Sequence, residues 1–337
     1  MTNKAKTFII SRTDSIGDVV LTLPVAGILK GHFPDCKIIF LGRNYTKPVV
    51  ECCEYVDEFI SWDEIAPKEI NHQIEIIRSL AADCIIHVFP NKKIALLAKK
   101  AKIPIRIGTS HRLFHWFTCN KLPNFTRKNS DLHEAQLNLK LLAALGITKK
   151  YSLGEIQSQF GFRKIKPLPQ ELRSMLDDNR IKLILHPTSK GSAREWGIEN
   201  FSELIKFLPK DKFQVFVTGT KEDAEYLKNF ISESNSVIDM TGKLSLSELI
   251  SFINNCDVLV AASTGPLHLA AVLGKKAIGI YSSLRPIHAG RWAPIGMNSQ
   301  YFVAEQICNN CKRGKPCNCM SSVKPHVVAE RIIKGSE

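Results

Sequence analysis

Short apolar runs alternate with amphipathic segments along the first half of the chain. A strand buried on both faces is continuously apolar, and this pattern predicts strands at residues 7–11, 37–41, 57–61, 83–88 and 105–107. The intervening segments predict helices at residues 19–30, 46–54, 69–81, 92–102 and 132–145, and Gly146 ends the last of them. Strands that alternate with helices predict a parallel sheet covered on both faces.

The proline-containing stretch 164–169 interrupts this pattern, and a second alternating run follows it. Predicted strands cover residues 182–185, 213–218, 236–239, 257–262 and 277–281, and predicted helices cover residues 198–208, 221–232 and 246–254. The chain therefore predicts an α/β fold with two Rossmann-like domains, residues 1–160 and 161–337. We expect the two domains to face each other across a ligand cleft at the carboxyl ends of their strands.

The stretch 258–274 predicts an apolar strand, a tight turn and a helix of small residues. Ser263 or Thr264 suits the N-cap position, Gly265 lets the backbone turn closely, and Pro266 suits the first helical turn. The free N–H groups at such a helix start can bind phosphate. A buried strand-to-helix turn without a ligand has the same pattern, so this stretch alone leaves both interpretations open.

A second candidate phosphate site follows the predicted strand 182–185. The loop after this strand carries hydroxyl, ammonium and guanidinium groups, which are donors that suit phosphate oxygens. The residues that supply them are Thr188, Ser189, Lys190 and Arg194. A solvated basic loop is the alternative. Leu244 and His268 are further candidates for contact with the same ligand, and a structural role is the alternative for both.

The loop at residues 11–24 follows the first predicted strand and opens the first predicted helix. It lacks the G-x-G-x-x-G pattern of dinucleotide-binding turns. Asp14 and Asp18 flank Gly17 at the helix start. A carboxylate in this place is either an N-cap or a general base that faces the ligand.

The 337 residues include 46 Lys and Arg against 32 Asp and Glu, which gives a formal net charge of +14. A positive balance of this size predicts an anionic partner: nucleic acid, a membrane surface or a phosphorylated substrate. No apolar run reaches the roughly eighteen residues that a membrane span needs. The short apolar run near the N-terminus predicts a first strand and not a secretion signal, so we expect a cytoplasmic protein.

Residues 99–128 contain eight basic residues, interleaved aromatic residues and no acidic residue. Arg106, Arg112, Trp116 and Lys121 are therefore candidates for contact with a lipid headgroup layer or a phosphorylated acceptor. Single-stranded nucleic acid would suit the same composition. A loop partly packed on its own domain is the third interpretation.

The chain has ten cysteines, which in a cytoplasmic protein predict reduced thiols or metal ligands and not a disulfide framework. Two close pairs, Cys308 with Cys311 and Cys317 with Cys319, are candidates for a structural zinc site. The alternative is a reduced or partly oxidised thiol cluster, because Cys-x-Cys is shorter than the usual zinc-knuckle spacing.

Three stretches together resemble glycosyltransferase family 9, the lipopolysaccharide heptosyltransferase family: residues 12–24 (RTDSIGDVVLTLP), residues 186–190 (HPTSK) with 194–196 (REW), and residues 263–270 (STGPLHLA). The resemblance implies a GT-B fold. Its N-terminal half would bind the acceptor, a growing lipopolysaccharide core, and its C-terminal half a nucleotide sugar such as ADP-heptose. It also implies an inverting transfer without a metal or other cofactor, by a cytoplasmic enzyme peripheral at the inner membrane.

The same resemblance implies roles for individual residues. Asp18 matches the family's proposed base, and Arg194 stands where the family often has a Lys that neutralises the leaving diphosphate. The residues expected to hold phosphate oxygens are Thr188, Ser189, Thr264 and Gly265. Ser263 stands where established ADP-heptose users commonly have Asp, and this departure leaves the donor sugar open.

The expected partners are therefore a nucleotide sugar, a phosphorylated glycolipid and the inner-membrane surface, with no nucleic acid. Another nucleotide-sugar enzyme, with a different donor, is one alternative. An epimerase would need acid–base groups on both faces of the sugar, and only Asp18 is a clear candidate. A basic nucleic-acid-binding protein is the other alternative, and it would leave the predicted phosphate loops unexplained.

Overall fold

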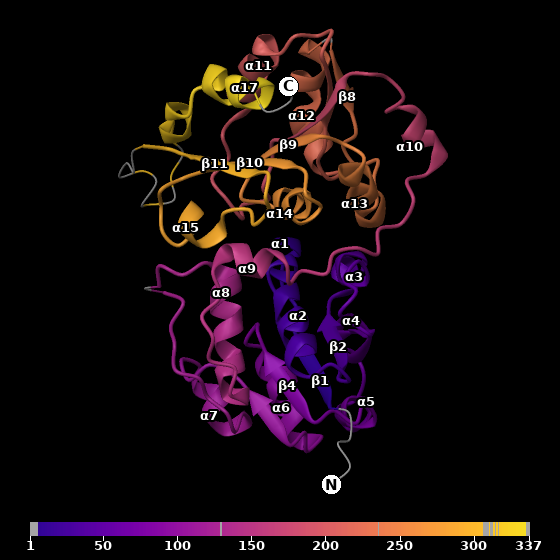
Figure 1. The fold of residues 1–337 in the computed structure, drawn as a ribbon, viewed down its shortest axis with the longest axis vertical. Helices are drawn as coiled ribbons and strands as arrows, with labels where there is room; N and C mark the ends of the chain where they lie inside the picture. The colour runs from indigo at the N-terminus through magenta and orange to yellow at the C-terminus, as the bar shows by residue number, and fades with distance from the viewer. Residues whose placement is uncertain are drawn as a thin grey trace. The chain divides into compact units, whose positions relative to one another are not determined.

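The computed structural model describes residues 6–128, 130–234, 236–305, 310, 313, 315 and 317–334. The chain divides into two compact units, unit 1 (Met1–Lys164) and unit 2 (Ile165–Glu337), each with its own parallel sheet. Figure 1 draws unit 1 from indigo to magenta and unit 2 from pink to yellow. The predicted fold class, α/β with two Rossmann-like sheets, is confirmed.

Unit 1 is built on a parallel sheet in the order β3-β2-β1-β4-β5. Its strands are β1 (Thr7–Ser11), β2 (Lys37–Gly42), β3 (Glu58–Ser61), β4 (Cys84–His87) and β5 (Ile105–Ile107). Its helices are α1 (Ile16–Val20), α2 (Leu23–His32), η1 (Asn44–Thr46), α3 (Lys47–Glu51), α4 (Trp62–Ile65), α5 (Ile70–Ser79), α6 (Lys92–Lys100), α7 (Leu113–Thr118), α8 (Glu134–Leu139), η2 (Lys140–Leu145) and α9 (Leu153–Gln157). The central strands β1, β2 and β4 are buried almost throughout, which explains their continuous apolar sequences.

Two predicted helices of unit 1 are each divided into two helices in the structure. The predicted helix 19–30 is two helices, because the chain breaks at Leu21 and Thr22 between α1 and α2. Pro24 has no N–H, and its ring would clash with the carbonyl of Val20 in a continuous helix. The predicted helix 132–145 is likewise α8 followed by the 3-10 helix η2, which ends at Gly146 with φ of 84° as the sequence predicted.

Unit 2 has a six-stranded parallel sheet in the order β11-β10-β9-β6-β7-β8. Its strands are β6 (Ile181–His186), β7 (Phe213–Val217), β8 (Val237–Asp239), β9 (Val258–Ala262), β10 (Lys276–Tyr281) and β11 (Ser299–Val303). Its helices are α10 (Gln170–Ser174), α11 (Ile198–Phe207), α12 (Asp223–Glu233), α13 (Leu246–Asn254), α14 (Gly265–Val272), α15 (Ala289–Trp292), η3 (Cys319–Ser322) and α17 (Pro325–Ile333). The aromatic rings of Trp196 and Phe201 pack edge to face at 5.0 Å in its core.

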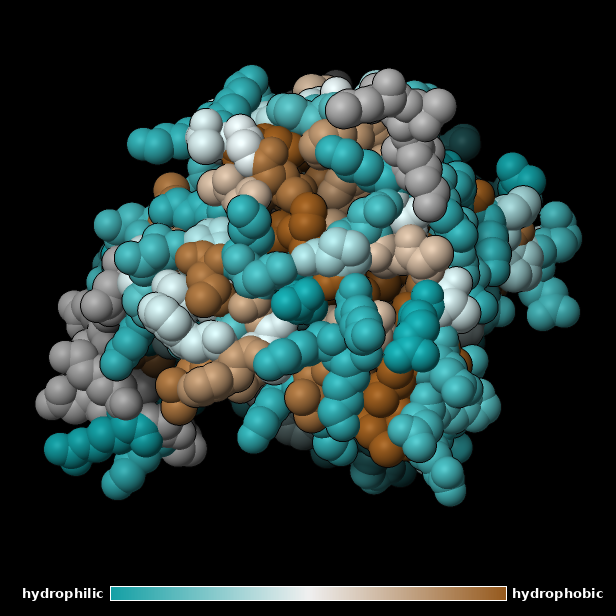
Figure 2. Space-filling view, turned by 90° about the horizontal axis from the view of Figure 1, so that it is seen from below, coloured by the Kyte–Doolittle hydropathy of each residue, from teal (hydrophilic) through white to brown (hydrophobic). Residues whose placement is uncertain are grey.

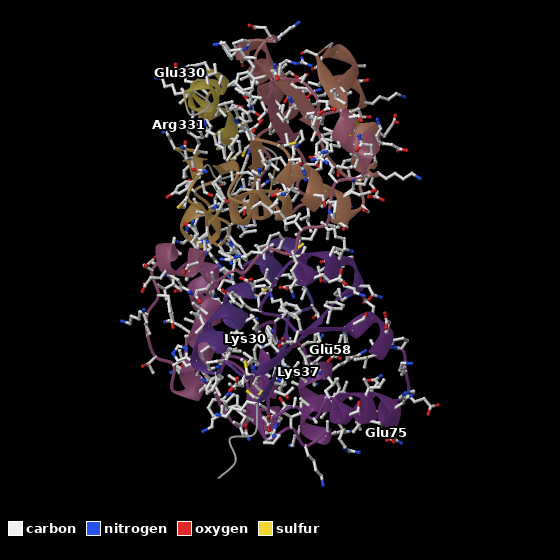
Figure 3. The ribbon with its side chains drawn as sticks, turned by 45° about the vertical axis from the view of Figure 1, so that its right-hand side comes forward. Lys30, Lys37, Glu58, Glu75, Glu330 and Arg331 are labelled. Atoms are coloured by element: carbon white, nitrogen blue, oxygen red, sulfur yellow. The ribbon has the colours of Figure 1, made fainter. Side chains whose placement is uncertain are left out.

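The surface is mostly hydrophilic on the side that Figure 2 shows, with brown apolar patches between teal side chains. Ion pairs tie neighbouring strands at the edge of unit 1. Lys37 at the start of β2 pairs with Glu58 at the start of β3 at 2.6 Å, as the neighbouring labels in Figure 3 indicate. Among the described residues, no helix combines the length and apolar character that crossing a membrane requires.

Candidate active site

Each sheet has a position at which the strand order reverses. In unit 1 the chain builds from β1 to β2 and β3 on one side and then adds β4 and β5 on the other side. In unit 2 the same reversal lies between β6 and β9. Ligands of open α/β sheets bind outside the carboxyl ends of the strands at such points. The loops that follow β1, β4, β6 and β9 are therefore the candidate ligand sites.

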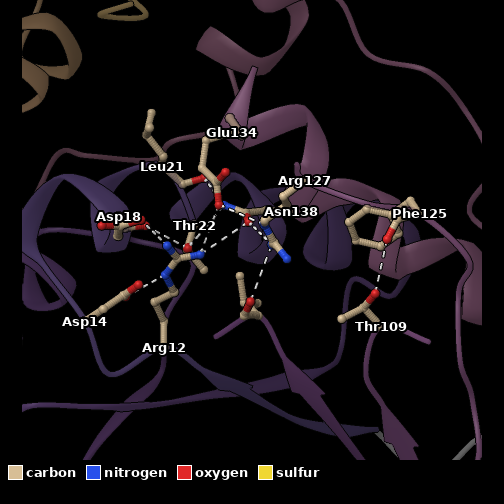
Figure 4. Close-up of polar contacts among 12 residues, drawn as sticks. Arg12, Asp14, Asp18, Leu21, Thr22, Thr109, Phe125, Arg127, Glu134 and Asn138 are labelled. Carbon is tan, nitrogen blue, oxygen red and sulfur yellow. Dashed lines mark hydrogen bonds and ion pairs between the residues drawn. The ribbon is translucent and has the colours of Figure 1, made fainter. Parts of the chain in front are cut away.

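A buried arginine organises the loop after β1. Arg12 is 3% exposed, and its Nε donates to Asp14 Oδ1 at 2.6 Å while its Nη2 donates to Asp18 Oδ1. Figure 4 shows both carboxylates around the guanidinium group. Asp18 lies in the first turn of α1, whose N-cap position is taken by Ser15, and it accepts a hydrogen bond from the Ser15 hydroxyl. Asp18 is therefore not the helix cap that the sequence left open.

Helix α8 supplies further partners of Arg12. Glu134 and Asn138 each accept from Arg12 Nη1 at 3.4 Å, and Arg127 donates to Glu134 at 3.1 Å and to Asn138 at 2.9 Å (Figure 4). Asn138 Nδ2 donates to the carbonyl of Leu21 at 3.0 Å, which ties α8 to the break between α1 and α2. Two guanidinium groups and three carboxylates thus form one cluster, in which Glu134 pairs with both arginines.

The charges of this cluster have opposing effects. Burial disfavours the charged form of Arg12, but the nearby carboxylates outweigh it and raise the pKa of Arg12 above its usual value. Burial raises the pKa of Asp14 to about 6 despite the attraction of Arg12. The side chains of Asp14 and Asp18 are 22% and 17% exposed, whereas that of Glu134 is 2% exposed. A ligand can therefore reach the first two carboxylates and not the third.

Local sequence patterns did not predict four residues of this cluster: Arg12, Arg127, Glu134 and Asn138. The available signal was Arg12 itself, a charged residue directly after an apolar strand, which is rarely buried without partners. Its partners on α8 lie more than a hundred positions away, so local patterns gave no sign of them.

The turn after β9 has the backbone predicted for residues 258–274. The strand is buried throughout, Thr264 takes the N-cap position, and α14 begins at Gly265 with Pro266 in its first turn. However, the Thr264 side chain makes no capping hydrogen bond, and its buried Oγ1 has no hydrogen-bond partner within the described part of the chain. A buried hydroxyl left unsatisfied costs about 1–3 kcal/mol, which a ligand oxygen at this position would relieve.

The loop after β6 lies beside this turn, since β6 pairs with β9 and the Ser192 hydroxyl donates to the Ser263 carbonyl at 3.4 Å. Thr188 in this loop is buried, and Arg194 is half-buried. The predicted donors after β6 and β9 are therefore brought together at one edge of the sheet.

Two of the predicted phosphate donors already have acidic partners. Glu195 Oε1 accepts from the N–H of Ser189 at 2.6 Å and from its hydroxyl at 2.9 Å. Lys190 Nζ pairs with Glu222 at 3.0 Å on the surface. These contacts close the loop, so Ser189 shapes it and Lys190 would have to exchange its partner to meet a phosphate.

Two other candidates of unit 2 differ in burial. His268 is 3% exposed within α14, and Leu244 is half-buried in the loop before α13. Ser245 caps α13 through a reciprocal capping box with Glu248. Leu244 thus stands at a fixed helix start.

The four basic and aromatic candidates of unit 1 separate into two groups. Arg106 Nε donates to the carbonyl of Thr118 at 2.8 Å, and its Nη1 donates to the carbonyl of Ile103, so this side chain braces the backbone. The backbone of Lys121 bridges to β5, although its side chain is exposed. Arg112 and Trp116 are exposed at α7.

Of the four cysteines proposed for zinc, Cys308 and Cys311 lie outside the described residues. Cys317 and Cys319 are half-buried. No group of three or more His, Cys, Asp or Glu that could hold a metal occurs among the residues the structure describes.

Two parallel Rossmann-like sheets, with candidate donor loops at the strand reversal of unit 2 and a carboxylate cluster at that of unit 1, give the chain a GT-B fold. The family profile "Glycosyltransferase family 9 (heptosyltransferase)" matches residues 72–320. The chain belongs to glycosyltransferase family 9.

Individual relatives agree with this assignment. Lipopolysaccharide heptosyltransferase 3 of Escherichia coli K12 is 24% identical over 291 residues, which cover 82% of each chain. The solved family 9 glycosyltransferase of Veillonella parvula has a TM-score of 0.79 and 21% identity, and the match covers 99% of this chain and 98% of that one. E. coli heptosyltransferase WaaC, solved with ADP, has a TM-score of 0.74 and 18% identity, covering 98% and 100%.

Proposed function

We propose that this enzyme transfers a heptose or a related sugar from a nucleotide-diphosphate sugar, ADP-heptose in the first instance, to the inner core of lipopolysaccharide. The relatives support this proposal because one is a lipopolysaccharide heptosyltransferase and another was solved with ADP. The observation that carries it is the start of α14, where the N–H groups of the first helical turn lie beside the Thr264 hydroxyl, which has no partner among the described residues.

In this proposal unit 2 holds the leaving diphosphate. The amides of Thr264 and Gly265 and the hydroxyls of Thr264 and Thr188 donate to phosphate oxygens, and Arg194 neutralises the charge that develops as the bond breaks. The loop-closing bonds of Ser189 to Glu195 keep these donors in place. A nucleoside diphosphate leaves readily only when donors or cations stabilise the negative charge that develops on it. These contacts therefore lower much of the activation free energy.

Asp18 acts on the acceptor in unit 1. One of its oxygens is bound by Arg12 and the other by Ser15, and a carboxylate retains further lone pairs beyond those two bonds. It accepts the proton of the acceptor hydroxyl, whose oxygen forms a bond to the anomeric carbon while the bond from that carbon to the diphosphate oxygen breaks. Attack from the side opposite the leaving group inverts the anomeric centre.

The test combines binding with transfer. Calorimetric titration with ADP, UDP and GDP identifies the nucleotide, and transfer is measured with ADP-heptose and a heptose-deficient lipopolysaccharide acceptor. Asp18→Asn should lower kcat by roughly 10²- to 10⁴-fold, as expected for loss of a general base, while ADP affinity stays nearly constant.

Asp14→Asn is the matched control, because it removes a second carboxylate from the same guanidinium. We expect it to change kcat much less than Asp18→Asn does. Unimpaired transfer by Asp18→Asn would remove Asp18 from catalysis. Preference for UDP or GDP would keep the glycosyltransferase proposal and change the donor, in line with Ser263.

A further inference from the structure

Helix α7 presents three large apolar side chains to solvent. Leu113, Trp116 and Phe117 are 77%, 60% and 67% exposed. Their spacing of i, i+3 and i+4 places them on one face of the helix. The opposite face carries His115 and Thr118, which are buried in unit 1. A contiguous apolar cluster that is exposed to solvent marks a site of contact with a partner.

The buried face of α7 fixes the helix to unit 1. His115 Nδ1 lies 2.9 Å from the carbonyl oxygen of Thr109, and its ring packs against that of Phe114 at 4.5 Å. Lys99 Nζ donates to the carbonyl of Phe117 at 2.7 Å, at the end of the helix. These contacts fix the orientation of α7, so Leu113, Trp116 and Phe117 are exposed in the folded unit 1.

The polar atom of the central ring is already satisfied. Trp116 Nε1 donates to the carbonyl of Ser110 at 2.8 Å. The indole thus offers its apolar edge and faces to a partner without leaving an N–H to be desolvated. That suits the boundary between headgroups and acyl chains better than a hydrogen-bonding protein surface.

The surroundings of α7 are basic. Not one acidic residue occurs between Asp83 and Asp131, a stretch that includes α6 and α7. Helix α6 packs beside α7 and turns its apolar side inward. The exposed cationic residues of the two helices and their flanks are Lys92, Lys93, Lys99, Lys100, Lys102, Arg112 and Lys121. Figure 2 views the molecule from below, the side on which Figure 1 draws α6 and α7, and shows apolar patches among hydrophilic side chains.

We propose that the α6–α7 surface docks on an anionic lipid bilayer, with Leu113, Trp116 and Phe117 entering the headgroup region and the lysines of α6 facing lipid phosphates. Charge complementarity selects this partner, because the surface combines an apolar tip with cations and lacks acids. The inference deepens the proposed function, since a lipid-anchored acceptor would be met at that surface. It assigns the membrane contact to α7 and α6, with Arg106 as a brace.

The experiment is vesicle co-sedimentation of the full chain. Binding is compared on phosphatidylcholine vesicles with and without about 30% phosphatidylglycerol, at low salt and at about 0.5 M salt. We expect binding to the anionic vesicles alone, lost at high salt. Trp116→Ser with Phe117→Ser should weaken binding at least about tenfold, and Lys92→Gln with Lys93→Gln and Lys100→Gln by about fivefold per lysine.

The matched control is Tyr226→Ser with Met297→Ser, which removes two side chains of unit 2 that are 59% and 82% exposed. It should bind vesicles as the unmodified chain does. Circular dichroism and ADP titration check that each variant is folded, and ADP titration also separates this inference from the proposed function. Equal vesicle binding by the α7 variant and its control would overturn the inference. So would self-association, or oligonucleotide binding, that depends on α7 in a chain that ignores vesicles.

Discussion

The burial of one histidine predicts how the free energy of unfolding changes at acid pH. His87 ends β4, is 1% exposed, and stacks on His115 with ring centroids 5.8 Å apart. Neither of its ring nitrogens has a hydrogen-bond partner among the residues that the structure describes. Burial lowers the pKa of His87 to about 3, and the nearby His115 and Arg106 act in the same direction.

The sign and size of the effect follow from linkage. An unfolded chain takes up this proton near pH 6.5, whereas the folded chain takes it up near pH 3. Between these values the unfolded state binds more protons, so the free energy of unfolding falls as pH falls, by up to about 1.4 kcal/mol per pH unit. From neutral pH to pH 5, His87 alone should cost about 2 kcal/mol.

The variant His87→Met isolates this contribution. Methionine has a similar volume and no titrating group, and replacing a buried polar group that has no partner should leave stability at pH 7.5 unchanged or higher. Urea unfolding is measured at pH 7.5, 6.5, 5.5 and 5. The stability difference between His87→Met and the unmodified chain should grow in favour of the variant by about 2 kcal/mol across this range.

A His87→Met chain that loses several kcal/mol at pH 7.5 and keeps the full acid dependence would refute the reasoning, and would indicate that the ring nitrogens serve a partner.

Two further predictions concern the candidate active site. Arg12→Met removes the guanidinium that pairs with Asp14, Asp18 and Glu134, and should cost about 3–5 kcal/mol of unfolding free energy. Arg12→Lys should cost less, and equal losses in urea unfolding would mean that charge is not the cause. Thr264→Val keeps the side-chain shape and removes the unpartnered hydroxyl, so stability should hold while ADP affinity falls about tenfold by calorimetry. Unchanged ADP affinity would exclude this hydroxyl from the phosphate site.

The sequence predicted most where a single local rule decides the structure. The buried strands of both sheets follow from continuous apolar runs, and α13 occupies the predicted residues because Ser245 and Glu248 form its capping box. The turn into α14 follows from Gly265 and Pro266. In each case the residues that determine the structure are neighbours in the chain.

The sequence predicted least where distant contacts or mixed patterns decide. β11 is a half-exposed edge strand of polar and apolar residues, so it has no continuous apolar run. α7 lies in a basic, aromatic stretch, and its orientation depends on the burial of His115. The carboxylate cluster depends on α8, whose approach to Arg12 no local pattern encodes. The long-range contacts of the candidate site are thus its least predictable part.

The hydrogen bonds of Asp18 indicate which part of the proposed reaction contributes most to lowering the activation barrier. Because one oxygen of Asp18 is held by Arg12 and the other by Ser15, the carboxylate is fixed in position before an acceptor arrives. Fixed position favours proton transfer through geometry, and stabilisation of developing charge by donors already in place is usually the largest single contribution to catalysis. The larger share of the barrier must then be lowered at the departing diphosphate. Substitutions at Thr264 and Arg194 should therefore impair transfer even when the acceptor still binds and Asp18 is intact.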